Sequence, residues 1–141
     1  MCDLGFAHLF SPAQTFPTPR LLAWYTDGGF VDEYGVFHAS GHYYNITMWE
    51  CLNEMEHGLS PEEYTLQYDR MVLGMRQHAP KGSQNLKFMA LALEDRNPAY
   101  FSYIFNKSNH LPGVPLPDAA SFHFYAGCSV RHLLPTLLIF F

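Results

Sequence analysis

The residues of this sequence best suited to chemistry are Asn53 and Glu54, an amide and a carboxylic acid that close an apolar run. A glutamic acid can give a proton to a leaving oxygen and later take one from water, so it serves as a general acid and base. The amide beside it can hold a substrate hydroxyl without adding charge. The pair therefore has the residue types of an acid–base site for a hydroxyl-bearing substrate.

The flanking residues predict that this pair lies in a strand-to-helix loop. Segment 44–49 is rich in β-branched and aromatic residues, which favours a strand. Ser60, Pro61 and Glu63 are typical of a capped helix start. In a parallel α/β barrel such loops follow the carboxyl ends of the strands, where active sites form. Apolar or aromatic residues then share one face of the expected helix: Tyr64, Tyr68, Met71, Val72 and Met75.

The alternation of side chains along the expected strand predicts a second acid, Glu50, on the same face as Glu54. Met48, Glu50, Leu52 and Glu54 would share one face unless a β-bulge intervenes. Glu50 then lies on the side of Glu54, and the sequence assigns it no role. A solvated loop acid is the alternative interpretation of Glu54.

Two further strands are expected downstream. Segment 86–93 is mostly apolar and short, which is typical of a strand buried on both faces of a parallel sheet. Asn97 and Pro98 offer another cap and first helical turn, for a short helix that stops near a loop at 106–118. Segment 119–126 then predicts the next strand.

Three segments together resemble a known family: residues 24–30 (WYTDGGF), 49–54 (WECLNE) and 121–126 (SFHFYA). They are similar to the retaining glycoside hydrolases of clan A, and most of all to glycoside hydrolase family 39, the β-xylosidases and α-L-iduronidases. The resemblance implies an α/β fold, namely part of a (β/α)8 TIM barrel with roughly strands four to six and their helices. It implies hydrolysis of O-glycosidic bonds in a carbohydrate substrate.

The resemblance also implies roles for individual residues. Glu54 becomes the general acid/base and Asn53 the ligand of the sugar 2-hydroxyl. His123 and Tyr125 are expected to point into the site, with Tyr125 near the nucleophile, and Trp49 is expected to contact substrate. The alternative interpretation of His123 and Tyr125 is that both are packed core residues. A retaining mechanism needs two carboxylates, and its acid must have a raised pKa in the resting enzyme.

The length and the end of the sequence differ from a whole barrel. A β/α barrel typically takes about 250 residues, whereas this sequence has 141. We expect an irregular segment at 1–20, a barrel fragment at 21–127 and an apolar tail at 128–141 that is not family sequence. No glutamate follows Glu94, so the nucleophile of the clan is missing. The isolated chain is therefore expected to be inactive.

Composition restricts the partners. Aromatic residues make up 16% and charged residues 15%, against a usual charged share of about 25%, which fits flat stacking surfaces for sugars. A net charge of −5 argues against nucleic acid. No membrane span is expected, because a span needs about 20 apolar residues. No cofactor is expected, and the sugar and the oligomeric state stay open.

Cysteine and histidine spacing indicates no metal site. Cys2, Cys51 and Cys128 are too few and too scattered for a disulfide framework or a zinc site. His38 and His42 stand four apart and are interpreted as loop or sugar-subsite residues. The retaining mechanism requires no metal.

Two sequons are usable if the protein is secreted, beginning at Asn45 and at Asn106. Asn106 is the better candidate, because it is expected in a loop whereas Asn45 opens a strand. The family resemblance favours secretion or lysosomal delivery, although the first residues show no signal peptide.

Two other classes of protein remain open. A structural or interaction protein, in which the Asn–Glu pair is only a loop, would be favoured if this pair lay far from His123 and Tyr125. The other is a sugar-binding module or pseudoenzyme, with a groove lined by aromatic residues: Trp24, Tyr25, Trp49 and Tyr125.

Overall fold

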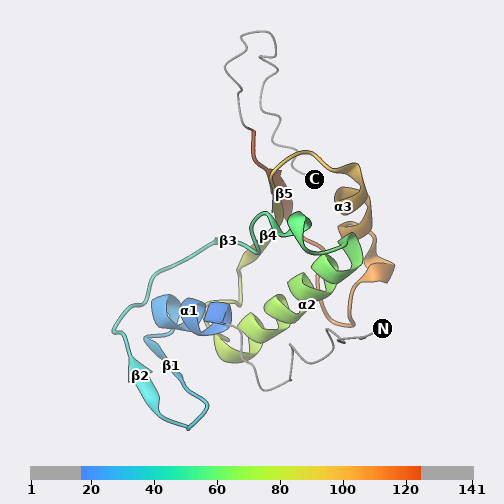
Figure 1. Ribbon diagram of the computed structural model, residues 1–141. Helices are drawn as coiled ribbons and strands as arrows, with labels where there is room; N and C mark the ends of the chain where they lie inside the picture. Colours follow the sequence, from blue (N-terminus) through green and yellow to red (C-terminus); the bar gives the residue numbers. More distant parts are fainter. Residues whose placement is uncertain (1–16, 125–141) are drawn as a thin grey trace, which may run out of the picture.

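The computed structural model describes residues 17–124 (Figure 1). Three α-helices alternate with five short strands and two 3-10 turns along this part of the chain. In order they are α1 (Pro17–Thr26), β1 (Gly29–Val31), β2 (Phe37–Ala39), β3 (Met48–Glu50), η2 (Met55–His57), α2 (Pro61–His78), β4 (Lys87–Leu93), α3 (Pro98–Ile104), η3 (Lys107–Asn109) and β5 (Ala119–Phe122).

A three-stranded parallel sheet of β3, β4 and β5 carries the second half of this region, with β4 in the centre. Met48 pairs with Lys87 and Met89 with Ala119. Helix α2 connects β3 to β4, and α3 connects β4 to β5. Parallel neighbours need such crossovers, so the predicted alternation of strand and helix is confirmed. The fold is mixed α/β, and the strands within residues 17–124 form no closed barrel.

The helix starts follow the predicted capping signals. Ser60 accepts from the backbone N–H of Glu63, while the Glu63 side chain accepts from the Ser60 N–H, which completes a capping box. Asn97 caps α3, and Pro98 opens its first turn. Helix α1 already begins at Pro17, so the last four residues of the expected irregular segment 1–20 are helical.

Strand β3 is shorter than the sequence predicts. Segment 44–49 was expected to be extended and paired, but only Met48–Glu50 pairs with β4. The backbone N–H of Tyr44 instead donates to the carbonyl of Tyr25 on α1, at 2.8 Å. Tertiary contacts with α1 therefore prevail over the β propensity of this segment, and Asn45 lies outside any strand.

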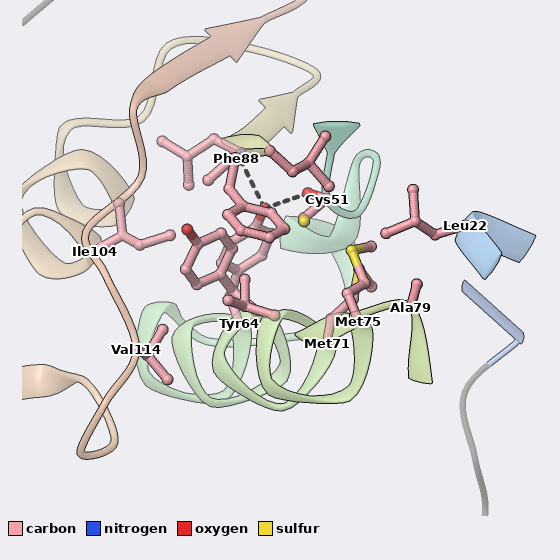
Figure 2. Close-up of a cluster of buried hydrophobic side chains, with 14 of the residues drawn as sticks. Leu22, Cys51, Tyr64, Met71, Met75, Ala79, Phe88, Ile104 and Val114 are labelled. Carbon is pink, nitrogen blue, oxygen red and sulfur yellow. Dashed lines mark hydrogen bonds between the residues drawn. The ribbon is translucent and has the colours of Figure 1, made fainter. Parts of the chain in front are cut away.

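The core lies between α2 and the parallel sheet (Figure 2). From Phe88 to Leu93, every residue of β4 except Met89 is buried, as expected for a strand covered on both faces. Helix α2 presents its buried residues to this strand and also packs against α1 and α3 (Figure 1). The predicted face is buried in full: Tyr64, Tyr68, Met71, Val72 and Met75.

A separate hairpin, β1 and β2, follows α1 and extends away from the parallel sheet (Figure 1). Its turn is closed by Asp32, whose carboxylate accepts from the backbone N–H groups of Tyr34 and Val36 at 2.9 Å. His38 lies 2.7 Å from Asp32 and belongs to β2. Of the two interpretations of His38 and His42, as loop or as sugar-subsite residues, the loop position is wrong for His38, whereas His42 does lie outside the strands.

Candidate acid–base site at the carboxyl edge of the sheet

The loop that carries Glu54 is fastened to the central strand. After β3 ends at Glu50, the backbone N–H of Cys51 donates to the carbonyl of Met89 at 2.8 Å. The N–H of Glu54 donates to the carbonyl of Ala92 at 2.9 Å. These two bonds hold the loop along the carboxyl half of β4, so the position of Glu54 is set by the sheet.

The Glu54 carboxylate meets the imidazole of His123 at this edge. Nδ1 of His123 lies 2.5 Å from Oε1 of Glu54, although 69 residues separate them in the sequence. The backbone N–H of His123 donates to the carbonyl of Leu93 at 2.6 Å, which fixes the residue just beyond β5. The two side chains are 29% and 34% exposed. Both residues are thus held by the central strand β4, and their side chains stay partly accessible to a ligand.

Backbone strain is concentrated around this pair. Leu52, Glu54, Leu91 and Ala92 have φ values of 66°, 50°, 84° and 42°, and they are the only non-glycine residues with positive φ in the described part of the chain. Such conformations cost about 1–3 kcal/mol each and gather at functional sites. They also break the alternation predicted beyond Glu50, so Leu52 and Glu54 do not continue the face of β3.

The hydroxyl of Tyr64 on α2 bonds to both strained segments, the one after β3 and the one at the end of β4. It donates to the carbonyl of Cys51 at 3.0 Å and accepts from the N–H of Leu91 at 2.7 Å (Figure 2). The register of β4 against β5 shifts between Leu91 and Leu93, so the hydroxyl satisfies a backbone group at the irregularity. Burial raises the pKa of Tyr64, which keeps this donor protonated.

The thiol beside this site is not a candidate nucleophile. Cys51 is fully buried, and burial, with a smaller contribution from the charge of Glu50, raises the pKa of its thiol to about 12. A thiol needs a lowered pKa to react as thiolate. Cys51 is therefore a packing residue.

Three further carboxylates surround the edge, and each has a partner. Glu50 accepts from the hydroxyl of Ser121, which ties β3 to β5 across the central strand. Glu56 accepts from the backbone N–H of Glu94, and the carboxylate of Glu94 lies 3.0 Å from the ring of His57. Glu50 is thus engaged by Ser121 of β5.

The remaining predicted site residues are Asn53, Trp49 and Tyr125. Asn53 is exposed next to Glu54. Trp49 is half-buried on β3 and packs against the core. Tyr125 lies outside the described residues. The sequence did not identify Tyr64 as a supporting residue, because its position on the apolar face of a helix gives only a packing signal.

Residues 17–124 contain neither a metal-binding cluster nor a helix suited to cross a membrane. No group of three or more histidine, cysteine, aspartate or glutamate side chains is arranged to hold a metal ion in this region. Likewise, none of its helices is both long and apolar enough to cross a membrane.

These observations define the class as an α/β protein whose parallel sheet carries a histidine–glutamate pair at its carboxyl edge. Comparison with family models finds no match, and neither curated proteins nor solved structures match the chain.

Proposed function

We propose that this chain is part of a retaining glycoside hydrolase of the family 39 type, built on a (β/α)8 barrel of which residues 21–127 contribute the central strands. Glu54 is the general acid/base in this proposal, and Asn53 binds the 2-hydroxyl of the sugar. The observation that carries the proposal is the contact between Glu54 and His123 at the carboxyl edge of a parallel sheet, where β/α-barrel enzymes place their catalytic groups.

The geometry favours this function over a purely structural loop. The Glu54–His123 pair is partly exposed, and positive-φ backbone of the kind that gathers at functional sites lies around Glu54. In the proposed reaction Glu54 protonates the glycosidic oxygen as the C1–O bond breaks and a second carboxylate bonds to C1. Glu54 then takes a proton from the water that attacks C1 and displaces that carboxylate. His123 holds the Glu54 carboxyl in place through Nδ1.

The second carboxylate has to come from elsewhere, since no glutamate follows Glu94 in the sequence. A small anion in solution can replace it. Azide attacks C1 of a phenyl glycoside, the C1–N bond forms as the C1–O bond breaks, and the phenolic oxygen takes the proton of Glu54. The products are a glycosyl azide and phenol, and Glu54 regains its proton from solvent.

The test measures azide-dependent phenol release from phenyl β-D-xyloside, α-L-arabinoside and α-L-iduronide, with the glycosyl azide identified by mass spectrometry. Removing a general acid typically costs 10²–10⁴-fold, so Glu54→Gln should lower the azide-dependent rate by roughly this factor. Glu62→Gln is the matched control, because Glu62 is an exposed acid on the first turn of α2.

Either of two results would overturn the proposal: equal release by the wild type and Glu54→Gln, or no azide-dependent release from any glycoside. Binding of these glycosides without cleavage, unaffected by Glu54→Gln, would instead favour a non-catalytic carbohydrate-binding fragment or pseudoenzyme.

A further inference from the structure

A pocket of about 250 Å³ lies at the amino edge of the parallel sheet. Three segments meet there: the end of α1, the connection that precedes β3 and the turn that precedes β4. Its volume is just below the roughly 300–1,000 Å³ of pockets that hold drug-sized ligands, so it fits a smaller molecule. The residues that matter for its chemistry are Tyr43, Tyr44, Asn45, Thr47, Lys81 and Asn85.

This pocket is distinct from the Glu54 site. The backbone N–H of Lys87, at the start of β4, donates to the carbonyl of Thr47 at 3.0 Å, so Thr47 marks the amino edge. Glu54 and His123 lie beyond the other end of β4, whose seven residues span roughly 20 Å. A ligand of monosaccharide size in the pocket cannot touch both places.

One wall of the pocket is fixed by Asp27. Its carboxylate accepts from the backbone N–H of Gly82 at 2.9 Å and from that of Lys81 at 3.3 Å. Gly82 must be a glycine here, since a Cβ would come within 1.9 Å of the hydroxyl oxygen of Thr26. The turn that carries Lys81 is thereby held against the end of α1 before any ligand binds.

Another part of the lining is aromatic. Tyr44 stacks on His42 with ring centroids 5.2 Å apart, and His42 stacks on Tyr25 at 5.9 Å. Tyr43 lies on Gly28, where a Cβ would be 2.3 Å from the tyrosine hydroxyl. Tyr43 and Tyr44 are nevertheless 71% and 57% exposed. Aromatic residues that are fixed in place but left in solvent mark an interaction surface.

The lining specifies the kind of ligand. Tyrosine rings cover apolar ring C–H groups, and amides and hydroxyls exchange hydrogen bonds with ligand hydroxyls. Among the lining residues that the structure describes, Lys81 has the one charged side chain, which favours an anion. The Asp27 carboxylate behind the turn opposes an anion, although it is engaged by Thr26, Lys81 and Gly82.

We propose that this pocket binds a small polyhydroxylated carboxylate of the sugar-acid class. The ammonium of Lys81 pairs with the carboxylate, the amides of Asn45 and Asn85 and the hydroxyl of Thr47 bond to the hydroxyls, and Tyr44 covers the ring. This second site is independent of the proposed hydrolysis at Glu54.

The test is an NMR titration of the full chain with D-glucuronate and, as the neutral match, D-glucose. Shifts of backbone amides should be confined to residues 43–47 and 81–85. An exposed ion pair contributes up to about 1 kcal/mol, so glucuronate should bind up to about fivefold more tightly than glucose. Lys81→Gln should bring the two affinities together, while Arg70→Gln, an exposed cation on α2, should leave the ratio unchanged.

Three results would overturn this inference: shifts at residues 53–54 and 121–124 instead, no saturable shifts, or a glucuronate preference that survives Lys81→Gln. Tyr44→Ala should weaken both sugars alike if the ring covers them. Glu54→Gln should change neither affinity. A negative result in the hydrolysis assay would therefore not affect this binding test, and a negative binding result would not affect the hydrolysis assay.

Discussion

Two of the four histidine–carboxylate pairs within residues 17–124 have nearly the same contact distance and very different surroundings. His110 lies 2.6 Å from Asp69, and their side chains are 0% and 1% exposed. His123 lies 2.5 Å from Glu54, with 34% and 29% exposure. Both pairs join segments far apart in the sequence. Residue type and distance therefore do not separate a structural pair from a candidate functional one.

The buried pair has its hydrogen-bonding positions filled. Nε2 of His110 faces the carbonyl of Ile104 at 2.5 Å, and the second oxygen of Asp69 accepts from the N–H of Leu111 at 2.6 Å. Both ring nitrogens of His110 therefore lie within hydrogen-bond distance of an oxygen atom. Asp69 belongs to α2, so this network fastens the connection between α3 and β5 to that helix.

The pair at the sheet edge has the opposite character. Its groups are partly open to solvent, and the backbone at Glu54 is in the left-handed region. Strain of this kind persists only where the surrounding structure enforces it. The buried pair therefore contributes to the stability of the fold, whereas the edge pair is held in place by the backbone around it.

The largest expected effect is on the buried pair. Asp69→Asn removes the buried carboxylate that contacts His110 and accepts from the N–H of Leu111, and should lower the free energy of unfolding by about 3–5 kcal/mol, as for other broken buried pairs. Urea unfolding followed by circular dichroism measures the loss. A loss of unfolding free energy below 1 kcal/mol would mean that the buried pair does not stabilise the fold, and would contradict this account.

A smaller loss of stability is expected when the buried Tyr64 hydroxyl, which bonds to Cys51 and Leu91, is removed. Tyr64→Phe leaves the N–H of Leu91 and the carbonyl of Cys51 without their hydroxyl partner, which should cost about 1–3 kcal/mol. Amide exchange at Leu91 should become faster. The control is Tyr68→Phe, because the Tyr68 hydroxyl is buried without a hydrogen-bond partner in the described residues. Its removal should leave stability unchanged or raise it, and equal losses in both variants would contradict this account.

The smallest effect on stability is expected at the edge pair itself. Glu54→Gln makes the same chemical change as Asp69→Asn, yet a partly exposed pair typically contributes only about 0–1 kcal/mol. The midpoint of urea unfolding should therefore shift little, while the azide-dependent rate falls. A loss of stability as large as that of Asp69→Asn would make the Glu54 pair structural as well.

Local signals predicted much of the framework. Ser60 and Glu63 fixed the start of α2, because a capping box depends only on neighbouring residues. The expectation that His123 points toward the site of Glu54 came from the family resemblance, and the two side chains lie 2.5 Å apart. The Asp69–His110 pair was not foreseen, since an aspartate within a helical pattern and a histidine in a loop give no sign that they will meet.

The sequence by itself determined the alternation of strands and helices, the buried face of α2 and the position of Glu54 in a loop, because these depend on periodicity and capping over a few residues. Only the tertiary structure decided that β3 is limited to Met48–Glu50 and that the His110–Asp69 pair is buried while the His123–Glu54 pair is accessible. Burial and pairing are set by contacts between distant segments, and these depend on how the helices cover the sheet.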